Sequence, residues 1–253
     1  MNINEALHMK KNKTIFTILI AAFLGIVSLS MNSSPVKAAS TVKLYLNSNS
    51  YVYNNKGQRL RGKGNYIRKN KAVTAPGKLQ KTNSVKRYYV MKDNSPIGVM
   101  NSNENLFNYL YWLPYKTIKK QEYYKIGYNR YIKCINVKSI YSKDLPSPYA
   151  NKANELITNQ ATVVTKDPKT INQKHIYALK EVSKNRAENA YVLPKNKKLV
   201  VDDTAGFDNM YAEAYHIKNT QYYIYAGDIV KRPKHTVYSH PYKSIINGVK
   251  TLY

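Results

Sequence analysis

The sequence is poor in several residue types that define common protein classes. Its 253 residues include one Cys, so no intrachain disulfide can form and a disulfide-stapled scaffold is excluded. Only 14 residues are Asp or Glu, which excludes an acidic, self-repelling chain. There are 4 Phe and 1 Trp beside 25 Tyr, and this ratio favours strands and wet aromatic surfaces over a deep aromatic core.

Positive charge is what the sequence has in excess. Lys and Arg number 41, which gives a formal net charge of +27. The excess is concentrated early in the chain, because residues 39–92 contain 13 basic residues and no acidic one. Hydrophobic residues make up 43%, too many for a disordered tail. We therefore expect a folded, basic protein whose partner is a polyanion.

The start of the chain has the pattern of an export signal. Three lysines at 10, 11 and 13 precede an apolar run over 15–29, and Val36-Lys37-Ala38 places small residues at a cleavage site. The alternative is an uncleaved anchor, but the run is shorter than the ~20 residues that a span needs. No later segment is apolar enough to span a membrane. We predict a signal peptide over residues 1–38.

Export narrows the choice of partner and location. Nucleic acid is not expected outside the cell, so wall polymers with phosphate backbones and anionic lipid headgroups remain. Export with a single Cys points to the surface of a Gram-positive bacterium rather than to a eukaryotic secretory route.

The local patterns predict a mainly β fold of two tandem small β-rich modules, SH3-like in size, with few short helices. Residues 43–53 alternate at their ends and are followed by the turn signal Asn54-Asn55-Lys56-Gly57. Residues 122–126 and 131–137 predict a hairpin with the four-residue loop 127–130. Ser102 ahead of Leu106 favours a short capped helix.

Within that hairpin, alternation assigns the side chains to two faces. Tyr124 and Ile126 share one face, as do Ile132 and Cys134, and we expect these four in the core. Lys125 and Lys133 would then point the other way, where a ligand can reach them.

Two prolines in Lys143-Asp-Leu-Pro-Ser-Pro-Tyr149 block helix and sheet pairing and indicate a linker. The predicted organisation is a first module over 39–141 with an insertion at about 72–110, a linker over 142–160, a second, divergent module over 161–231, and a basic C-terminal extension over 232–253. We expect the extension to be an extra strand or a frayed tail.

The two halves resemble each other around the hairpin. The matching positions are Tyr124-Lys-Ile126 with Tyr215-His-Ile217, Tyr131-Ile132 with Tyr223-Ile224, Cys134 with Ala226, and Val137 with Ile229. An internal repeat is therefore predicted, with extra residues in the first copy.

The segment Tyr123-Tyr-Lys-Ile-Gly-Tyr-Asn-Arg-Tyr-Ile-Lys-Cys-Ile-Asn-Val137 resembles the end of the surface-layer protein A (SLAP) domain of lactobacilli. Tyr53-Asn-Asn-Lys-Gly-Gln-Arg59 resembles an earlier turn of the same family. The likeness is weaker over 161–230, where the first Gly and the Asn-x-x-Gly turn are missing. The resemblance implies modules that attach surface proteins non-covalently to the wall through (lipo)teichoic acid or a related polymer, with no catalytic activity and no cofactor.

Seven basic residues lie within the sixteen residues from Lys56 to Lys71, with no acidic residue among them. A polymer with a phosphate at every repeat needs spaced cations rather than one pocket, and Arg forks to phosphate oxygens. The alternative is that these side chains are simply solvated. The predicted polymer-binding residues are Lys56, Arg59, Arg61, Lys63, Arg68, Lys69, Lys71, Lys125, Arg130 and Lys133.

Signals for enzymatic chemistry are weak. Cys134 has no His near it in sequence and is better explained as a small buried residue. His235 and His240 lack a third ligand, which is more typical of a surface tail than of a metal site. We therefore expect no catalytic and no metal site. A surface-layer protein is expected as a further partner, and this chain as an associated protein rather than the lattice former. A secreted wall hydrolase and a cationic adhesin stay open as alternatives.

Overall fold

The structure is a computed structural model that describes residues 40–91, 110–145, 153–184, 186–209, 212–239, 244–246 and 249–251. In this part the prediction of a mainly β fold is confirmed: antiparallel strands dominate, and the helices are the short 3₁₀ segments η2 (Cys134–Asn136), η3 (Pro168–Ile171) and η4 (Ala226–Asp228). The signal peptide predicted over 1–38 and the short helix predicted after Ser102 lie outside the described residues.

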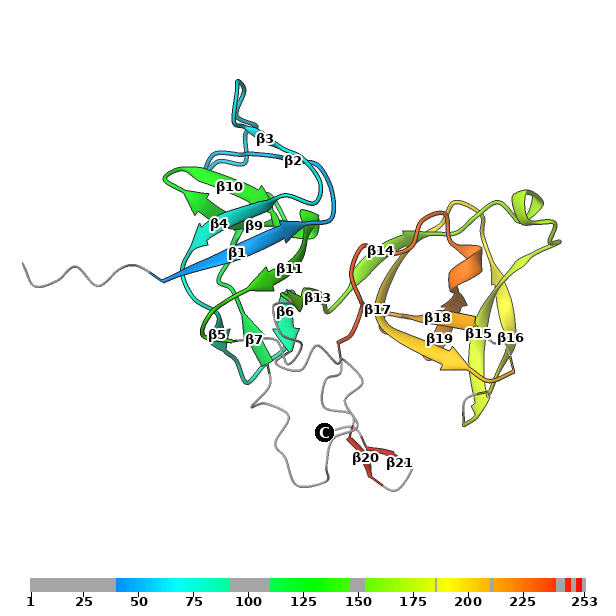
Figure 1. Ribbon diagram of the computed structural model, residues 1–253. Helices are drawn as coiled ribbons and strands as arrows, with labels where there is room; N and C mark the ends of the chain where they lie inside the picture. The colour runs from blue at the N-terminus through cyan, green and yellow to red at the C-terminus, as the bar shows by residue number, and fades with distance from the viewer. Residues whose placement is uncertain are drawn as a thin grey trace, which may run out of the picture. The chain divides into compact units, whose positions relative to one another are not determined.

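The first group of strands forms several small sheets (Figure 1), and its buried residues form a large cluster and a smaller one made by Tyr89, Met91, Leu110 and Ile157. Its strands are β1 (Thr41–Leu46), β2 (Ser50–Tyr51), β3 (Tyr66–Ile67), β4 (Ala72–Pro76), β5 (Gln80–Lys81), β6 (Tyr88–Met91), β7 (Leu110–Trp112), β8 (Lys116–Ile118), β9 (Gln121–Gly127), β10 (Arg130–Lys133), β11 (Val137–Tyr141), β12 (Asn154–Glu155) and β13 (Ile157–Thr158).

Strand β1 is central to this group because it pairs on both edges, with β11 and with β4. Its residues alternate between solvent and core, and Val42, Leu44 and Leu46 are each at most 1% exposed. Side chains on a strand alternate with a period of two, so the sequence Thr-Val-Lys-Leu-Tyr-Leu places one apolar face inward.

The hairpin β9–β10 is present, but its loop is shorter than predicted. Gly127 pairs with Arg130, so only Tyr128 and Asn129 form the turn instead of the four residues 127–130. Asn129 has a φ of +50°, a conformation that Asn tolerates and that a tight turn needs.

The predicted division of this hairpin into faces is confirmed in part. Tyr124, Ile132 and Cys134 are fully buried and Lys125 is exposed, but Ile126 and Lys133 are both half-buried. The second predicted strand of the hairpin ends early, because Cys134–Asn136 turns into η2 and the chain resumes as β11.

Two predicted segments contain sheet residues. Within the region 72–110, predicted as an insertion, β4 pairs with β1. Within the predicted linker 142–160, β12 pairs with β11 and β13 pairs with β6. The module boundaries themselves stay predictions.

The second group is one six-stranded antiparallel sheet with its own core, in the order β14-β17-β18-β19-β15-β16. Its strands are β14 (Ala161–Val164), β15 (Ile176–Ser183), β16 (Arg186–Leu193), β17 (Lys198–Phe207), β18 (Ala212–Ile217) and β19 (Tyr222–Tyr225). The hairpin β20–β21 follows, formed by Ser244–Ile246 and Val249–Thr251.

The positions matched between the two halves have similar local geometry. Tyr124 pairs with Ile132 across β9–β10, and Tyr215 pairs with Ile224 across β18–β19. A 3₁₀ turn follows each hairpin, starting at Cys134 and at Ala226 respectively. The repeat as a whole remains a prediction.

Residues Lys231–Ser239, which we call the C-terminal strap, cover the end of the predicted second module and the start of the predicted extension. Val237 forms a parallel bridge with Thr158, and the Tyr238 amide donates to the Thr158 carbonyl over 2.9 Å. The Tyr89 hydroxyl donates to the Tyr238 carbonyl over 2.7 Å. The expectation of a frayed tail is therefore wrong for this stretch, because its backbone is paired.

Candidate polyanion-binding surface

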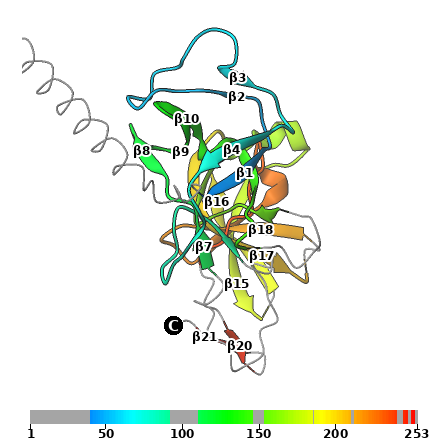
Figure 2. The same ribbon diagram turned by 60° about the vertical axis from the view of Figure 1, so that its left-hand side comes forward.

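Seven of the predicted site residues lie on one excursion of the chain, residues 52–71, which we call the cation loop. It runs from the end of β2, through β3, to the start of β4. All seven of its basic side chains are exposed. In both views the strands β2 and β3 of this region lie beside β10 (Figure 1 and Figure 2).

The loop begins with a turn that its own sequence specifies. The Asn54 side-chain oxygen accepts from the backbone amides of Lys56 and Gln58, each over 3.0 Å. Gly57 has a φ of +74°, a conformation that favours glycine. This Asn-x-x-Gly turn presents Lys56 to solvent, as the sequence predicted.

The cation loop is fixed to the hairpin by backbone pairing. Tyr53 and Tyr131 exchange hydrogen bonds, with N–O distances of 2.8 and 2.9 Å. The Asn55 amide donates to the Asn129 side-chain oxygen over 2.8 Å. The loop is therefore held as an additional edge of the hairpin rather than projecting freely.

The pairing brings the three hairpin cations to the loop. Arg130 donates from Nη2 to the Gly64 carbonyl over 2.9 Å, which ties the start of β10 to the cation loop. The Lys133 ammonium lies 5.5 Å from the centre of the Tyr53 ring. Lys125 is exposed and lies opposite Tyr131 in the ladder. Cations far apart in the sequence thus lie on one continuous part of the structure.

Tyrosines complete this surface, and the sequence patterns do not single them out individually. Tyr51 and Tyr66 pair across β2–β3 with ring centres 5.1 Å apart. The Arg59 guanidinium carbon lies 3.3 Å from the Tyr51 ring centre. The alternation Tyr51-Val-Tyr53 is the available signal, because it puts the two rings on the face opposite the buried Val52.

Within the part of the chain that the structure describes, the cations of this surface show no ion pair with a carboxylate. Among the described residues, the ion pairs are Lys195–Asp167, His216–Asp202 and Arg232–Glu213, and none includes any of the ten predicted polymer-binding residues. No described carboxylate neutralises this charge, and eight of the ten side chains are exposed while Arg130 and Lys133 are half-buried.

Two candidate chemistries can be checked in the described residues, a reactive thiol and a metal site. Cys134 is fully buried, and burial raises the pKa of its thiol well above the ordinary value, so it is not a reactive thiolate. Within the described ranges, no group of three or more His, Cys, Asp or Glu side chains could hold a metal ion. None of the helices there has the length and hydrophobicity of a membrane span.

These features define a small β-rich unit with an exposed cationic loop. The comparison with protein families identifies the module more closely. Residues 35–99 and 103–135 match the family model described as the Surface layer protein A domain. The match confirms the family resemblance over these residues and indicates a surface-layer-type protein located at the cell surface. The comparison with curated proteins gave no match.

Proposed function

We propose that this protein is exported and anchors itself non-covalently to the wall of a Gram-positive bacterium by binding an anionic wall polymer such as (lipo)teichoic acid. The observation that carries the proposal is the cation loop: seven exposed basic side chains in sixteen residues, docked on the hairpin that carries three more. The family match supports it, because it indicates a surface-layer-type protein.

The binding mode follows from the geometry of both partners. A teichoic acid carries a phosphodiester at each repeat, so its charge is spread along a thread. Spaced cations on a loop displace the counterions of several successive phosphates, and the affinity then depends on salt as it does for nucleic acids. Arginine contributes a bidentate fork and lysine a point charge. Tyrosine rings on the same surface pack against the polyol or sugar CH groups.

The direct test is retention of the purified protein on isolated walls, before and after extraction of teichoic acid. We expect retention only on the unextracted walls. A variant with Arg59, Arg61 and Arg68 replaced by Ala should bind several-fold more weakly. The matched control replaces three exposed lysines of the second group, Lys174, Lys184 and Lys198, and removes the same charge.

Three outcomes would contradict the proposal. Equal loss in both variants would mean that only net charge matters. Co-sedimentation with anionic liposomes in the absence of wall would favour a cationic adhesin. Clearing of peptidoglycan in a zymogram would favour a wall hydrolase.

We further propose that the protein associates with a surface layer rather than forming its lattice. The support is the family match together with the charged surface described above, which suits attachment. Growth of an ordered lattice from the purified protein alone, seen by electron microscopy, would contradict this.

A further inference from the structure

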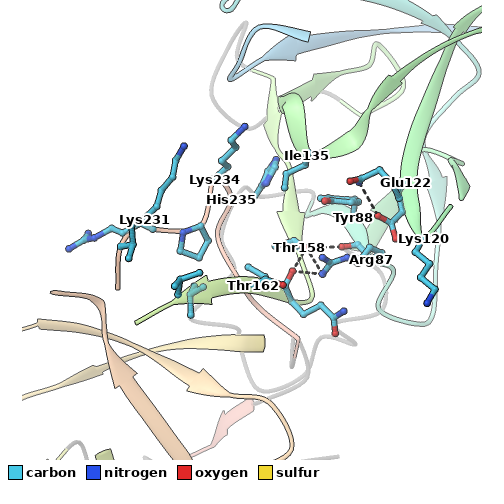
Figure 3. A pocket seen from close by; sticks show the side chains of 18 residues that line it. Arg87, Tyr88, Lys120, Glu122, Ile135, Thr158, Thr162, Lys231, Lys234 and His235 are labelled. Atoms are coloured by element: carbon cyan, nitrogen blue, oxygen red, sulfur yellow. Dashed lines mark hydrogen bonds between the residues drawn. The ribbon is translucent and has the colours of Figure 1, made fainter. Parts of the chain in front are cut away.

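A second cationic feature lies at a pocket of about 480 Å³. The C-terminal strap contributes Lys231, Lys234 and His235 to its wall, and β6 with its preceding residue contributes Arg87 and Tyr88 (Figure 3). A concave site of this volume is large enough for a small ligand group.

The wall of this pocket is strongly unbalanced in charge. Its basic residues are Arg87, Lys120, Lys231, Arg232, Lys234 and His235, and its acidic residue is Glu122. Arg232 is the one of these cations for which the described residues show a carboxylate partner, Glu213, at 3.1 Å. The remaining positive charge is not compensated by the protein groups that line the pocket.

Two of these cations are held in place by neutral groups. Arg87 donates from Nη1 to the Thr158 hydroxyl over 3.1 Å and also to the Gln160 carbonyl. Lys234 donates from Nζ to the Ser48 hydroxyl over 2.9 Å. Such contacts fix the positions of the cations without cancelling their charge, which is the arrangement of a preorganised anion site.

The cations also lie close enough to influence one another. Partial desolvation and the nearby ammonium groups of Lys231 and Lys133 lower the pKa of Lys234. Burial and the charges of Lys234 and Arg87 lower the pKa of His235, although its Nε2–H donates to the Val137 carbonyl over 2.7 Å. An anion seated here would relieve this mutual repulsion.

Lys133 connects this pocket to the cation loop. Its ammonium lies 5.5 Å from the Tyr53 ring of the loop, and Lys234 of the strap donates from Nζ to the side-chain oxygen of Asn136, three residues further along, over 3.5 Å. The basic surface therefore continues from the loop, across β10, to the strap.

We propose that the pocket beside the C-terminal strap seats a phosphate group of the anionic wall polymer on its Lys231 and Lys234 side, with Arg87 adding positive charge from the opposite wall, while neighbouring repeats lie on the cation loop (Figure 3). The inference rests on the proposed function for the identity of the polymer. What the inference adds is one defined site for a phosphate group. The cation loop, in contrast, offers cations spread along a surface.

The test uses the ring resonances of His235 as the reporter, assigned with a His235→Gln variant. The purified protein is titrated with a short poly(glycerol phosphate), with inorganic phosphate, and with vesicles containing phosphatidylglycerol. We expect the oligomer to shift the His235 resonances and to raise the pKa of His235, because a bound phosphate favours the imidazolium. A Lys231→Gln/Lys234→Gln variant should raise the Kd for the oligomer by about tenfold, as expected when two charged contacts are lost.

The matched control is Lys174→Gln/Lys198→Gln, which should leave the titration unchanged. If the oligomer binds the protein but the His235 resonances do not shift, the proposal that the pocket binds phosphate is wrong. Equal shifts with inorganic phosphate at the same phosphate concentration would also overturn it as a polymer site, and shifts with vesicles alone would assign the pocket to lipid headgroups.

The two proposals can fail separately. Oligomer binding at His235 without retention on walls would support the phosphate pocket and contradict wall anchoring. If the protein is retained on walls through the cation loop but the His235 resonances do not shift, wall anchoring would be supported and the phosphate pocket contradicted.

Discussion

The guanidinium of Arg59 is stacked over the ring of Tyr51, with 3.3 Å between the guanidinium carbon and the ring centre. Tyr51 in turn packs against Tyr66 across β2–β3. This contact orders a side chain that would otherwise sample many rotamers, while its N–H edge stays available to a phosphate. Arg59 is therefore a preoriented donor within a loop of exposed cations.

The stacking predicts that Arg59→Lys is not a conservative change. Lysine keeps the charge but loses the planar contact with Tyr51 and the bidentate fork, so we expect weaker binding of poly(glycerol phosphate) with nearly unchanged salt dependence. Arg59→Ala should also reduce the slope of log K against log salt by about one. Isothermal titration at several salt concentrations measures both quantities, and identical affinities for wild type and Arg59→Lys would contradict the stacking argument.

Gly57 is expected to control the shape of the cation loop. It has a φ of +74°, and a Cβ atom there would lie 2.9 Å from Cγ2 of Ile118. Gly57→Ala should therefore destabilise the protein by about 1–3 kcal/mol, through both strain and the clash.

Gly62→Ala is the control for that change. Gly62 has a φ of +90°, but a Cβ atom added there would have nothing within 4 Å, so only the conformational part of the cost applies. Urea denaturation should rank Gly57→Ala below Gly62→Ala in stability, and the opposite order would contradict the packing of the loop turn on β8.

Local features of this fold could be predicted from the sequence, but pairings between distant segments could not. The burial of Tyr124 and Ile132 followed from alternation, and the turn at Asn54 followed from its residue types, since both are local patterns. The pairing of Tyr53 with Tyr131 and of Thr158 with Val237 joins segments 78 and 79 residues apart, for which no local signal exists. The cations could therefore be predicted individually, but the strap beside them could not.

His216 is expected to make stability fall as the pH rises. Its Nδ1 lies 2.6 Å from an Asp202 carboxylate oxygen and its Nε2 lies 2.6 Å from the Thr220 carbonyl, so both nitrogens face acceptors. The hydrogen bond to Asp202 is the main cause that raises the pKa of His216. The stabilisation is complete when the pH is below the ordinary histidine pKa of about 6.5. It is lost as the pH rises through the higher pKa that His216 has in the folded protein. Chemical denaturation across this range should show the loss, and a His216→Gln variant with the same pH dependence as wild type would contradict it.

His235 is expected to act in the opposite direction. Burial and the charges of Lys234 and Arg87 lower its pKa, so the folded state favours the neutral ring. As the pH falls below about 6.5, the unfolded chain takes up the proton first and the protein loses stability. His235→Gln should flatten the acid side of the stability profile. The same denaturation series measures this. If His235→Gln and the wild type lose stability equally at low pH, the nearby cations do not lower the pKa of His235.

The most direct test of the central claim is the salt dependence of binding between the purified protein and purified teichoic acid. If the exposed cation loop binds successive phosphates, log K falls linearly with log salt, and replacing Arg59, Arg61 and Arg68 by Ala makes the line shallower by about two to three units of slope. Binding that is independent of salt, or a slope that the triple replacement leaves unchanged, would contradict the account.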